Sequence, residues 1–473
     1  MRWQLALLLT SVYLVNGISR RKLFGSNGPL GVIGNGDPGQ PLYLSPLIKA
    51  GKLDEARSMS EVDSTAFLGI KSHSGYLTVN ETCGSNMFFW YFPTTFADPK
   101  APVLLWLQGG PGGSSLFGLF NEHGPFYVDA NMTLHKRMYT WTKKYSVVYI
   151  DNPVGTGFSF TEQDSCYSKN EDDVAVNLYS ALSQFFMVFA DVQPNDFYAT
   201  GESYAGKYVP AITLKIHQEN MQAPKVKINL RGMIIGDGLC DPESMFPQYA
   251  PFLYNIGLLD ENQQKYFDTW VSIAVGYIQS KEYMQAFKIF DNLLNGDLTG
   301  YKSWFYNQTG LDFYFNYLLP VAPESFVYLN TFLPQDSVRR SIHVGNKTFN
   351  DGNKVEMILR NDMMDTVKPR VAQILDANYK VLMYSGVLDI IVALPLTEAF
   401  LQTVPWSGLE GYKSAPREIW KLQKTDVDVA GYVRVYKNLV QVAVRGAGHI
   451  LPYDQPERAW QMVDAFISEF HPK

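Results

Sequence analysis

The sequence has few cysteines and no clustered metal-binding motif. Its 473 residues include only three cysteines, Cys83, Cys166 and Cys240. Three cysteines form one disulfide at most and leave one thiol, which excludes a small disulfide-stapled scaffold and makes core burial the main source of stability. Neither a Cys-x-x-Cys pair nor a His-Glu-x-x-His segment occurs, so we expect no metal site and no cofactor.

Strong charge and long hydrophobic runs are also missing. The formal net charge is −6, and no dense basic stretch is interleaved with aromatic residues, so we expect no nucleic-acid partner. Beyond the N-terminus, no window has the ~18 uninterrupted apolar residues that a transmembrane helix needs, so we expect no membrane span. The chain is long enough for a large core, either as one α/β domain with an insertion or as two domains.

The N-terminus has the pattern of a secretory signal peptide over residues 1–17. Arg2 precedes an apolar run from Leu5 to Val15, which is too short to span a membrane. Residues 18–40 are expected to form a loop or a pro-segment, and the mature protein is expected in the secretory pathway, either secreted or in the endolysosomal lumen. Four Asn-x-Thr triplets support this route and predict glycosylation at Asn80, Asn131, Asn307 and Asn346.

Apolar periodicity predicts an α/β fold with a mostly parallel sheet. Apolar residues at helical spacing over 170–189 lie between two predicted strands, which indicates a βαβ unit. Helical spacing also dominates from 262 to 294, so residues 41–240 and 335–473 are expected to form the core, and 241–334 a helical lid insertion. The predicted strands cover 75–79, 87–92, 103–107, 147–150, 197–200, 226–235, 380–384 and 439–444, and a closing helix covers 456–470.

The stretch 196–210 places a serine between two glycines at a predicted strand-to-helix turn. Ser203 is the centre of a Gly-x-Ser-x-Gly pattern, and a helix is expected from Tyr204 onward. A nucleophile held on a sharp turn has a strained backbone, and flanking glycines remove side chains that would collide. The pattern also occurs by chance in a chain this long, so a glycine-rich turn without catalysis is the alternative. A catalytic serine requires a base, an acid and an oxyanion site.

The positions of the histidines restrict the choice of base. In an α/β hydrolase the acid and the base follow the serine in the order Ser, Asp or Glu, His. Asp389 lies just after the predicted strand at 380–384, and beyond it only His449 and His471 remain. His471 is in the C-terminal tail, whereas His449 follows the last predicted strand in a loop of small residues. We therefore expect Ser203, Asp389 and His449 to form a proton relay, with a structural or surface role as the alternative for His449.

We expect the oxyanion site in a segment whose backbone is not covered by its own side chains. The segment 109–115 (GGPGGSS) follows the buried strand at 103–107 and has almost no side chain to pack. A flexible glycine-rich turn is the alternative. We expect the backbone N–H groups of Gly110 and Tyr204 to form the oxyanion hole.

Four segments together resemble the signatures of one enzyme family. They are 106–115 (WLQGGPGGSS), 151–159 (DNPVGTGFS), 201–210 (GESYAGKYVP) and 448–456 (GHILPYDQP). In this order they are similar to motifs of the serine carboxypeptidases, particularly the vitellogenic-like branch, and the resemblance covers the chain from about Gly39 to the C-terminus. It implies an α/β-hydrolase fold and the hydrolysis of C-terminal peptide bonds, mostly in acidic compartments.

The resemblance also implies roles for residues outside the relay. It assigns Gln108 and Glu202 to the binding of the substrate's terminal carboxylate, with Glu122 and Trp106 supporting them. Several carboxyl groups in a closed site cannot all be ionised, so protons are retained and binding should favour low pH. A helix N-terminal acid is the alternative for Glu202.

Two positions depart from the family pattern. Gln108 stands where the family usually has Asn, which predicts an altered affinity or preference for the terminal residue. Gly113 replaces a Cys common in this loop, so the family's disulfide pattern is not carried over.

The sequence therefore predicts an acid-active serine carboxypeptidase that cleaves peptide or protein C-termini through an acyl-enzyme. An esterase or acyltransferase of the same fold is one alternative, but it leaves Gln108, Glu202 and Glu122 without a purpose. The other is a lumenal binding or protective protein whose catalytic machinery is incidental. The oligomeric state is left open, with a homodimer as one alternative.

Overall fold

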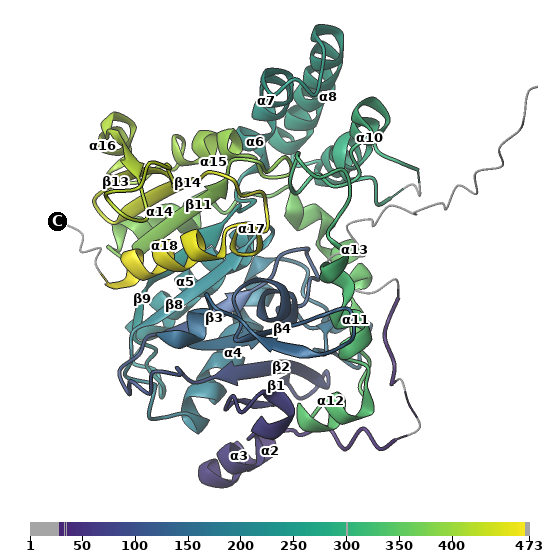
Figure 1. The fold of residues 1–473 in the computed structure, drawn as a ribbon, viewed down its shortest axis with the longest axis vertical. Coiled ribbons are helices and arrows are strands. Elements are labelled where there is room, and N and C mark those ends of the chain that lie inside the picture. Colours follow the sequence, from purple (N-terminus) through teal and green to yellow (C-terminus); the bar gives the residue numbers. More distant parts are fainter. Residues whose placement is uncertain (1–27, 33, 35, 299–300, 469–473) are drawn as a thin grey trace, which may run out of the picture.

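The computed structural model describes residues 28–32, 34, 36–298 and 301–468, so the predicted signal peptide lies outside the described residues. A ten-stranded sheet runs through the centre of the molecule (Figure 1). Its strands, in spatial order, are β1 (His73–Asn80), β2 (Ser85–Phe92), β6 (Ser146–Ile150), β3 (Val103–Leu107), β8 (Phe197–Glu202), β9 (Leu230–Gly236), β11 (Lys380–Gly386), β14 (Leu439–Val444), β13 (Gly431–Tyr436) and β12 (Arg417–Trp420).

The sheet is parallel in its middle and antiparallel at its edges. The six strands from β6 to β14 pair in parallel, whereas β1 and β2 on one side and β13 and β12 on the other pair antiparallel. All five residues of β3 are buried, as expected for a parallel strand covered on both faces. This is the α/β-hydrolase architecture that the sequence predicts.

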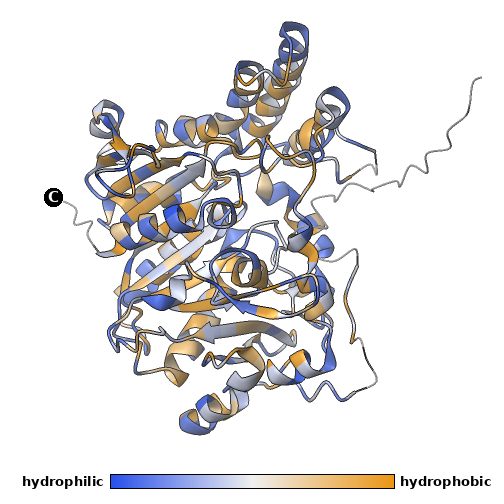
Figure 2. Cartoon of the chain, viewed as in Figure 1, coloured by the Kyte–Doolittle hydropathy of each residue, from blue (hydrophilic) through white to orange (hydrophobic). Residues whose placement is uncertain are grey.

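Strand β8 shows how helices cover both faces. Phe197 packs against Phe186 of α4 (Glu171–Val188), with ring centroids 5.8 Å apart, whereas the next residue, Tyr198, packs against Phe466 of α18 (Pro456–Ser468) at 6.2 Å. Because successive strand residues point to opposite faces, α4 and α18 lie on opposite sides of the sheet (Figure 1). Hydrophobic residues gather along the sheet and on the helix faces turned toward it (Figure 2).

The helices of the core have these bounds: α2 (Ser45–Lys49), α3 (Leu53–Met59), α4 (Glu171–Val188), α5 (Ala205–Met221), α14 (Lys368–Asp376), α15 (Leu394–Leu401), α16 (Leu409–Ser414), α17 (Leu451–Asp454) and α18 (Pro456–Ser468). The helix expected over 170–189 is α4, and its N-cap is Asn170, whose Oδ1 accepts a 3.0 Å hydrogen bond from Asp173 N. The strand expected over 226–235 begins only at Leu230, because its ladder to β8 starts there, opposite Phe197.

Between β9 and β11 the chain is mostly helical. Within the described part of this region, 237–298 and 301–379, the one strand is the two-residue β10 (Asn350–Asp351), which pairs with β7 (Thr156–Gly157). Besides α14, the α-helices of this region are α6 (Pro242–Met245), α7 (Tyr249–Asn255), α8 (Glu261–Gln279), α9 (Tyr283–Phe290), α10 (Trp304–Thr309), α11 (Leu329–Phe332), α12 (Asp336–Ser341) and α13 (Asn353–Met363). Helices α7, α8 and α10 project beyond one end of the sheet in Figure 1.

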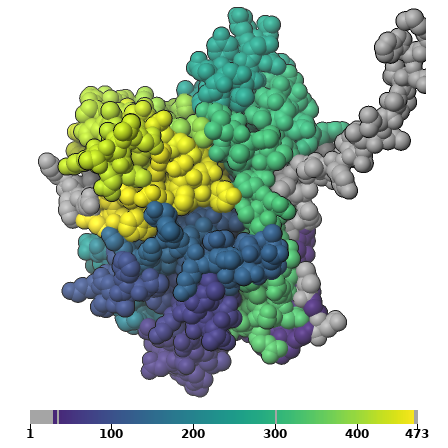
Figure 3. Space-filling model, viewed as in Figure 1, coloured from purple at the N-terminus to yellow at the C-terminus, as the bar shows by residue number. Residues whose placement is uncertain are grey.

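Segments far apart in the sequence meet on the surface. Lys144 Nζ donates a 2.6 Å hydrogen bond to Asp464 of α18. Figure 3 shows the C-terminal part of the chain, in yellow, beside a segment from the first third of the chain, in blue. Over the described ranges, no helix has both the length and the hydropathy needed to cross a bilayer.

The three cysteines form one disulfide and leave one free thiol, in agreement with the expectation of one disulfide at most. Cys83, in the turn between β1 and β2, forms a disulfide with Cys166, which lies shortly before α4. Cys240 is a buried free thiol.

Candidate active site

Ser203 occupies a strained turn between β8 and α5. Its φ is +62°, a left-handed backbone conformation that residues other than glycine rarely adopt. Three backbone hydrogen bonds hold it there: Ser203 N donates to Gly236 O at 3.0 Å, and Ser203 O accepts from Leu239 N at 3.0 Å and from Gly206 N at 2.9 Å. The predicted turn is therefore present, with the serine directly after the strand.

The glycine-rich loop after β3 lies directly against this turn. A Cβ added to Gly109 would be 2.5 Å from Ser203 Cβ and 2.5 Å from Tyr204 N, which no side chain permits. Gly110, the next residue, has a φ of +119°. Tyr204 is the N-cap residue of α5, where backbone N–H groups have no intrahelical acceptor. The structure thus places Gly109, the neighbour of Gly110, directly against Ser203 and Tyr204.

His449 and Asp389 form a buried pair. His449 Nδ1 and Asp389 Oδ2 are 2.7 Å apart, and both side chains are fully buried. Backbone N–H groups of Ile391 and Val392 donate to Asp389 Oδ1 and Oδ2 at 2.9 and 3.2 Å. Burial raises the pKa of Asp389, while His449 and these donors oppose the shift. On the other side of the ring, His449 Nε2 has no hydrogen-bond partner among the described residues.

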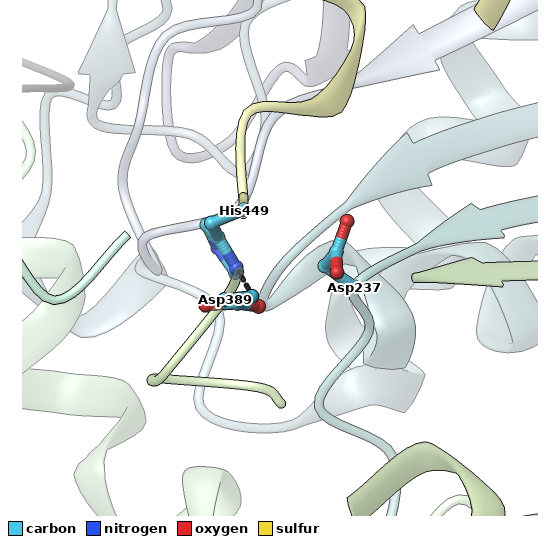
Figure 4. A group of neighbouring side chains, drawn as sticks. All are labelled: Asp237, Asp389 and His449. Carbon is cyan, nitrogen blue, oxygen red and sulfur yellow. Dashed lines mark hydrogen bonds and ion pairs between the residues drawn. The ribbon is translucent and has the colours of Figure 1, made fainter. Parts of the chain in front are cut away.

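A third residue, the acid Asp237, connects this pair with the serine turn. It follows Gly236, whose carbonyl accepts the Ser203 N–H. The carboxylate oxygens of Asp237 and Asp389 and a ring nitrogen of His449 all lie within 4.8 Å of one another (Figure 4). Within the described ranges these three residues also form the one set of three potential metal ligands. Because His449 and Asp389 are already hydrogen-bonded to each other, we interpret the set as a proton-transfer site.

The sequence analysis missed Asp237. The available signal was the Gly-Asp-Gly segment at 236–238, directly after a buried strand, which resembles the small-residue turns that carry the other candidate residues. No second motif in the sequence connects Asp237 with the catalytic residues.

Trp106, Gln108 and Glu202 form a hydrogen-bonded row beside the serine. Trp106 Nε1 donates to Gln108 Oε1 at 3.0 Å, and Gln108 Nε2 donates to Glu202 Oε1 at 2.6 Å. All three side chains are fully buried, and Glu202 immediately precedes Ser203. The extra methylene of Gln108 therefore does not prevent the amide from reaching Glu202.

Glu122 completes this group from the π-helical turn η2 (Gly118–Glu122). Burial raises the pKa of Glu122 to about 8, and the neighbouring polar groups of Glu202 and Gln108 limit the shift. The pKa of Glu202 is raised well above its ordinary range, first by burial and then by the negative charge of Glu122. At acidic pH both carboxyl groups are therefore neutral and able to donate hydrogen bonds.

One residue of the helical region reaches the histidine. The rings of Phe315 and His449 are stacked, with centroids 4.6 Å apart and planes 10° apart, and His449 N donates to Phe315 O at 2.7 Å. No sequence motif marks Phe315, so this contact was not predicted.

The four predicted glycosylation residues, Asn80, Asn131, Asn307 and Asn346, are all exposed.

Sequence comparison gives strong matches over most of the chain. The family described as "Serine carboxypeptidase" matches residues 62–469. The human "Probable serine carboxypeptidase CPVL" is 54% identical over 432 residues, which cover 91% of this chain and 90% of the relative. The "Venom serine carboxypeptidase" of Apis mellifera is 46% identical, covering 91% of each, and the "Vitellogenic carboxypeptidase" of Aedes aegypti is 42% identical, covering 91% and 90%.

A solved structure agrees on the fold. The prohormone-processing carboxypeptidase KEX1(DELTA)P from Saccharomyces cerevisiae superposes with a TM-score of 0.76 at 22% sequence identity, covering 87% of this chain and 96% of its own. The match to the family and the 54% identity to the human relative show that the chain belongs to the serine carboxypeptidase family and is a serine-type carboxypeptidase.

Proposed function

We propose that Ser203, His449 and Asp389 carry out peptide hydrolysis. Ser203 Oγ attacks the carbonyl of the last peptide bond while His449 Nε2 accepts the hydroxyl proton. The same proton then passes to the leaving amine, so that the C-terminal amino acid departs and an acyl-enzyme remains. Water, deprotonated by His449, hydrolyses the ester. The observation that carries this proposal is the 2.7 Å contact between His449 Nδ1 and Asp389, which leaves Nε2 without a partner.

The oxyanion of each tetrahedral intermediate would bind to the backbone N–H groups of Gly110 and Tyr204. Support comes from the contact of Gly109 with the serine turn, which sets Gly110 beside it. Donors fixed in a dry site stabilise developing charge without reorganisation, and losing one such donor typically costs about 10²–10³ in turnover.

Specificity for a free C-terminus would come from the group formed by Gln108, Glu202, Glu122 and Trp106. Glu202 Oε2 is buried and has no hydrogen-bond partner among the described residues, so it is free to donate, when protonated, to a substrate carboxylate. Trp106 orients the Gln108 amide through its indole N–H. An ester or an amidated peptide would leave these groups unpaired.

Acidic pH should favour this binding. An ionised Glu122 or Glu202 would repel the substrate carboxylate, and a neutral one attracts it. Because the pKa of Glu122 is about 8, the pair retains protons throughout the acidic range.

The segment 241–334 would act as a lid that shapes the side-chain pockets. Its residue Phe315 packs on the His449 ring, so the segment reaches the site directly. The predicted signal peptide and the exposure of Asn80, Asn131, Asn307 and Asn346 support entry into the secretory pathway, with glycosylation there. The protein would work after secretion or in the endolysosomal lumen.

The test is hydrolysis of one peptide, as free acid and as C-terminal amide, at pH 5. Wild type should release the terminal residue from the acid and act far more slowly on the amide, whereas Ser203→Ala should be inactive on both. Equal slow release by wild type and Ser203→Ala would refute the proposal.

A further inference from the structure

Asp237 is a buried acid that neither the proton relay nor the carboxylate-binding group uses. It lies in the turn after β9 with a φ of +42°, and its N–H donates to Tyr384 O at 2.8 Å. Gly386 N donates to Asp237 Oδ1 at 2.9 Å. These bonds tie Asp237 to β11, the strand that leads to Asp389, so its side chain has a fixed position beside the relay.

Two fully buried carboxyl groups, Asp237 and Asp389, face each other there (Figure 4). Both cannot be ionised at this separation in a site without water, so one retains a proton. Three donors point at Asp389, from Ile391 N, Val392 N and His449 Nδ1. Asp237 Oδ1 has one, and Asp237 Oδ2 has none among the described residues. The negative charge is therefore better stabilised on Asp389, and the proton belongs to Asp237.

Electrostatics agree with this assignment. Burial, followed by the charge of Asp389, raises the pKa of Asp237 well above its ordinary range. The titratable groups that face Asp237 from the surrounding elements are Asp389, His449, Asp454, Glu202 and Tyr384.

We propose that Asp237 is a positioning residue whose neutral carboxyl donates a hydrogen bond from Oδ2 to Asp389. This inference rests on the proposed relay. The bond adds a fourth donor to Asp389 and fixes its carboxylate in the orientation that receives the His449 Nδ1–H. When Asp237 loses its proton at higher pH, the donor disappears and a second negative charge lies beside Asp389. The Asp389 carboxylate is then no longer held in the orientation that receives the His449 Nδ1–H, so turnover falls.

The test compares two substitutions that both tolerate the local backbone. Asparagine readily adopts a positive φ, and in Asp237→Asn its oxygen accepts from Gly386 N while its NH₂ donates to Asp389 at every pH. Glycine also adopts this φ, and Asp237→Gly removes the donor. Substitutions that remove an orienting hydrogen bond to a catalytic group typically cost about 10–100-fold in activity. At pH 5 we expect Asp237→Gly to lower kcat by that factor while KM stays within about threefold.

Two measurements distinguish a positioning role of Asp237 from a packing role: the recovery of kcat in the asparagine variant and the pH dependence of kcat. Asp237→Asn should recover most of the kcat lost in Asp237→Gly. We expect kcat of wild type to fall at alkaline pH, and this fall should move to higher pH in Asp237→Asn. Turnover is counted per active site labelled by a serine-directed phosphonate, so a partly misfolded sample does not alter the result. Asp464→Asn is the matched control, because it removes a carboxylate that bonds to Tyr145 and Lys144 instead of the relay.

The inference is overturned if Asp237→Asn and wild type have the same alkaline fall in kcat, or if the asparagine variant is as slow as the glycine variant at pH 5. The first outcome decides the matter even if Asp237→Gly fails to fold. If wild-type hydrolysis does not depend on Ser203, the proposed function fails and this inference with it. If that dependence holds and the Asp237 results are negative, this inference alone fails.

Discussion

Gln108 donates a 2.6 Å hydrogen bond from its side-chain amide to Glu202, the residue that precedes the serine. The amide cannot turn around without losing the bond from Trp106 to its oxygen. Gln108 therefore holds one oxygen of Glu202 and leaves the other for a ligand. In the proposed function, this group binds the substrate carboxylate and is already formed before the substrate arrives, which limits the entropic cost of binding.

The first prediction concerns the pH dependence of substrate binding. Glu122 is neutral below about pH 8 and negative above it, so the KM for a free-acid peptide should rise as pH passes through 8. We expect a rise of about tenfold or more between pH 5 and pH 9, which corresponds to about 1.4 kcal/mol. In Glu122→Gln, steady-state kinetics should show a flatter profile.

The amidated peptide is the internal control, because it has no carboxylate to repel and its KM should lack this rise. An identical rise in wild type and Glu122→Gln would show that another group controls binding.

The second prediction concerns stability. The folded protein holds the Glu122 proton up to about pH 8, whereas an unfolded chain releases it near the ordinary value of 4.5. The folded state binds more protons between these values, so the contribution of Glu122 is complete below pH 4.5 and is lost as pH rises to 8. Urea unfolding at pH 5, 6.5 and 8 should give a decreasing free energy of unfolding, with a smaller decrease in Glu122→Gln.

Glu261→Gln, on the exposed part of α8, should keep the wild-type slope. If Glu122→Gln has that slope too, the proton on Glu122 does not contribute to stability.

How far the sequence predicts the fold depends on where each element finds its partners. Strands β3 and β14 match the predicted runs residue for residue, because continuous apolar segments bury both faces. Strand β12 was missed: three of its four residues are exposed, and it exists only because β13 offers it a partner. The edges of a sheet depend on tertiary pairing, which a single-sequence pattern does not contain.

The residues of the candidate site likewise fall into those that the sequence indicates and those that depend on tertiary pairing. The order of motifs was enough to predict Ser203, Asp389 and His449, and the family resemblance supplied the roles of Glu202 and Gln108. Asp237 could not be predicted, because its approach to Asp389 follows from the pairing of β9 with β11, strands that are separated by more than one hundred residues.

The third prediction tests the contact between the glycine-rich loop and the serine turn. Gly109→Ala would place a methyl group 2.5 Å from Ser203 Cβ and Tyr204 N, so the loop must shift and the oxyanion donors must separate. We expect kcat to fall about 10²-fold, in the range for the loss of an oxyanion donor. The measurement is kcat per labelled active site at pH 5.

Gly276→Ala in α8 is the matched control, because an added Cβ there meets nothing within 4 Å. It should retain wild-type kcat and gain slightly in helix stability. Equal activity of the two variants would contradict the close approach at Gly109.

The fourth prediction concerns the disulfide between Cys83 and Cys166, which are 83 residues apart in the sequence. Cross-linking so long a segment restricts the unfolded chain, and removing the bond typically costs about 2–4 kcal/mol. Cys83→Ser should lower the free energy of urea unfolding by that amount while kcat/KM at pH 5 stays close to that of wild type. Wild type unfolded under reducing conditions should approach the same midpoint, and a variant as stable as the oxidised wild type would disprove this contribution.

The central claim, that Ser203 is a nucleophile activated by His449, is tested most directly by labelling with a fluorophosphonate and locating the adduct by mass spectrometry. At pH 5 the adduct should form on Ser203 alone, stop hydrolysis at one label per chain, and form about 10³-fold or more slowly in His449→Ala. An adduct on another serine, or labelling as fast without His449 as with it, would contradict the account.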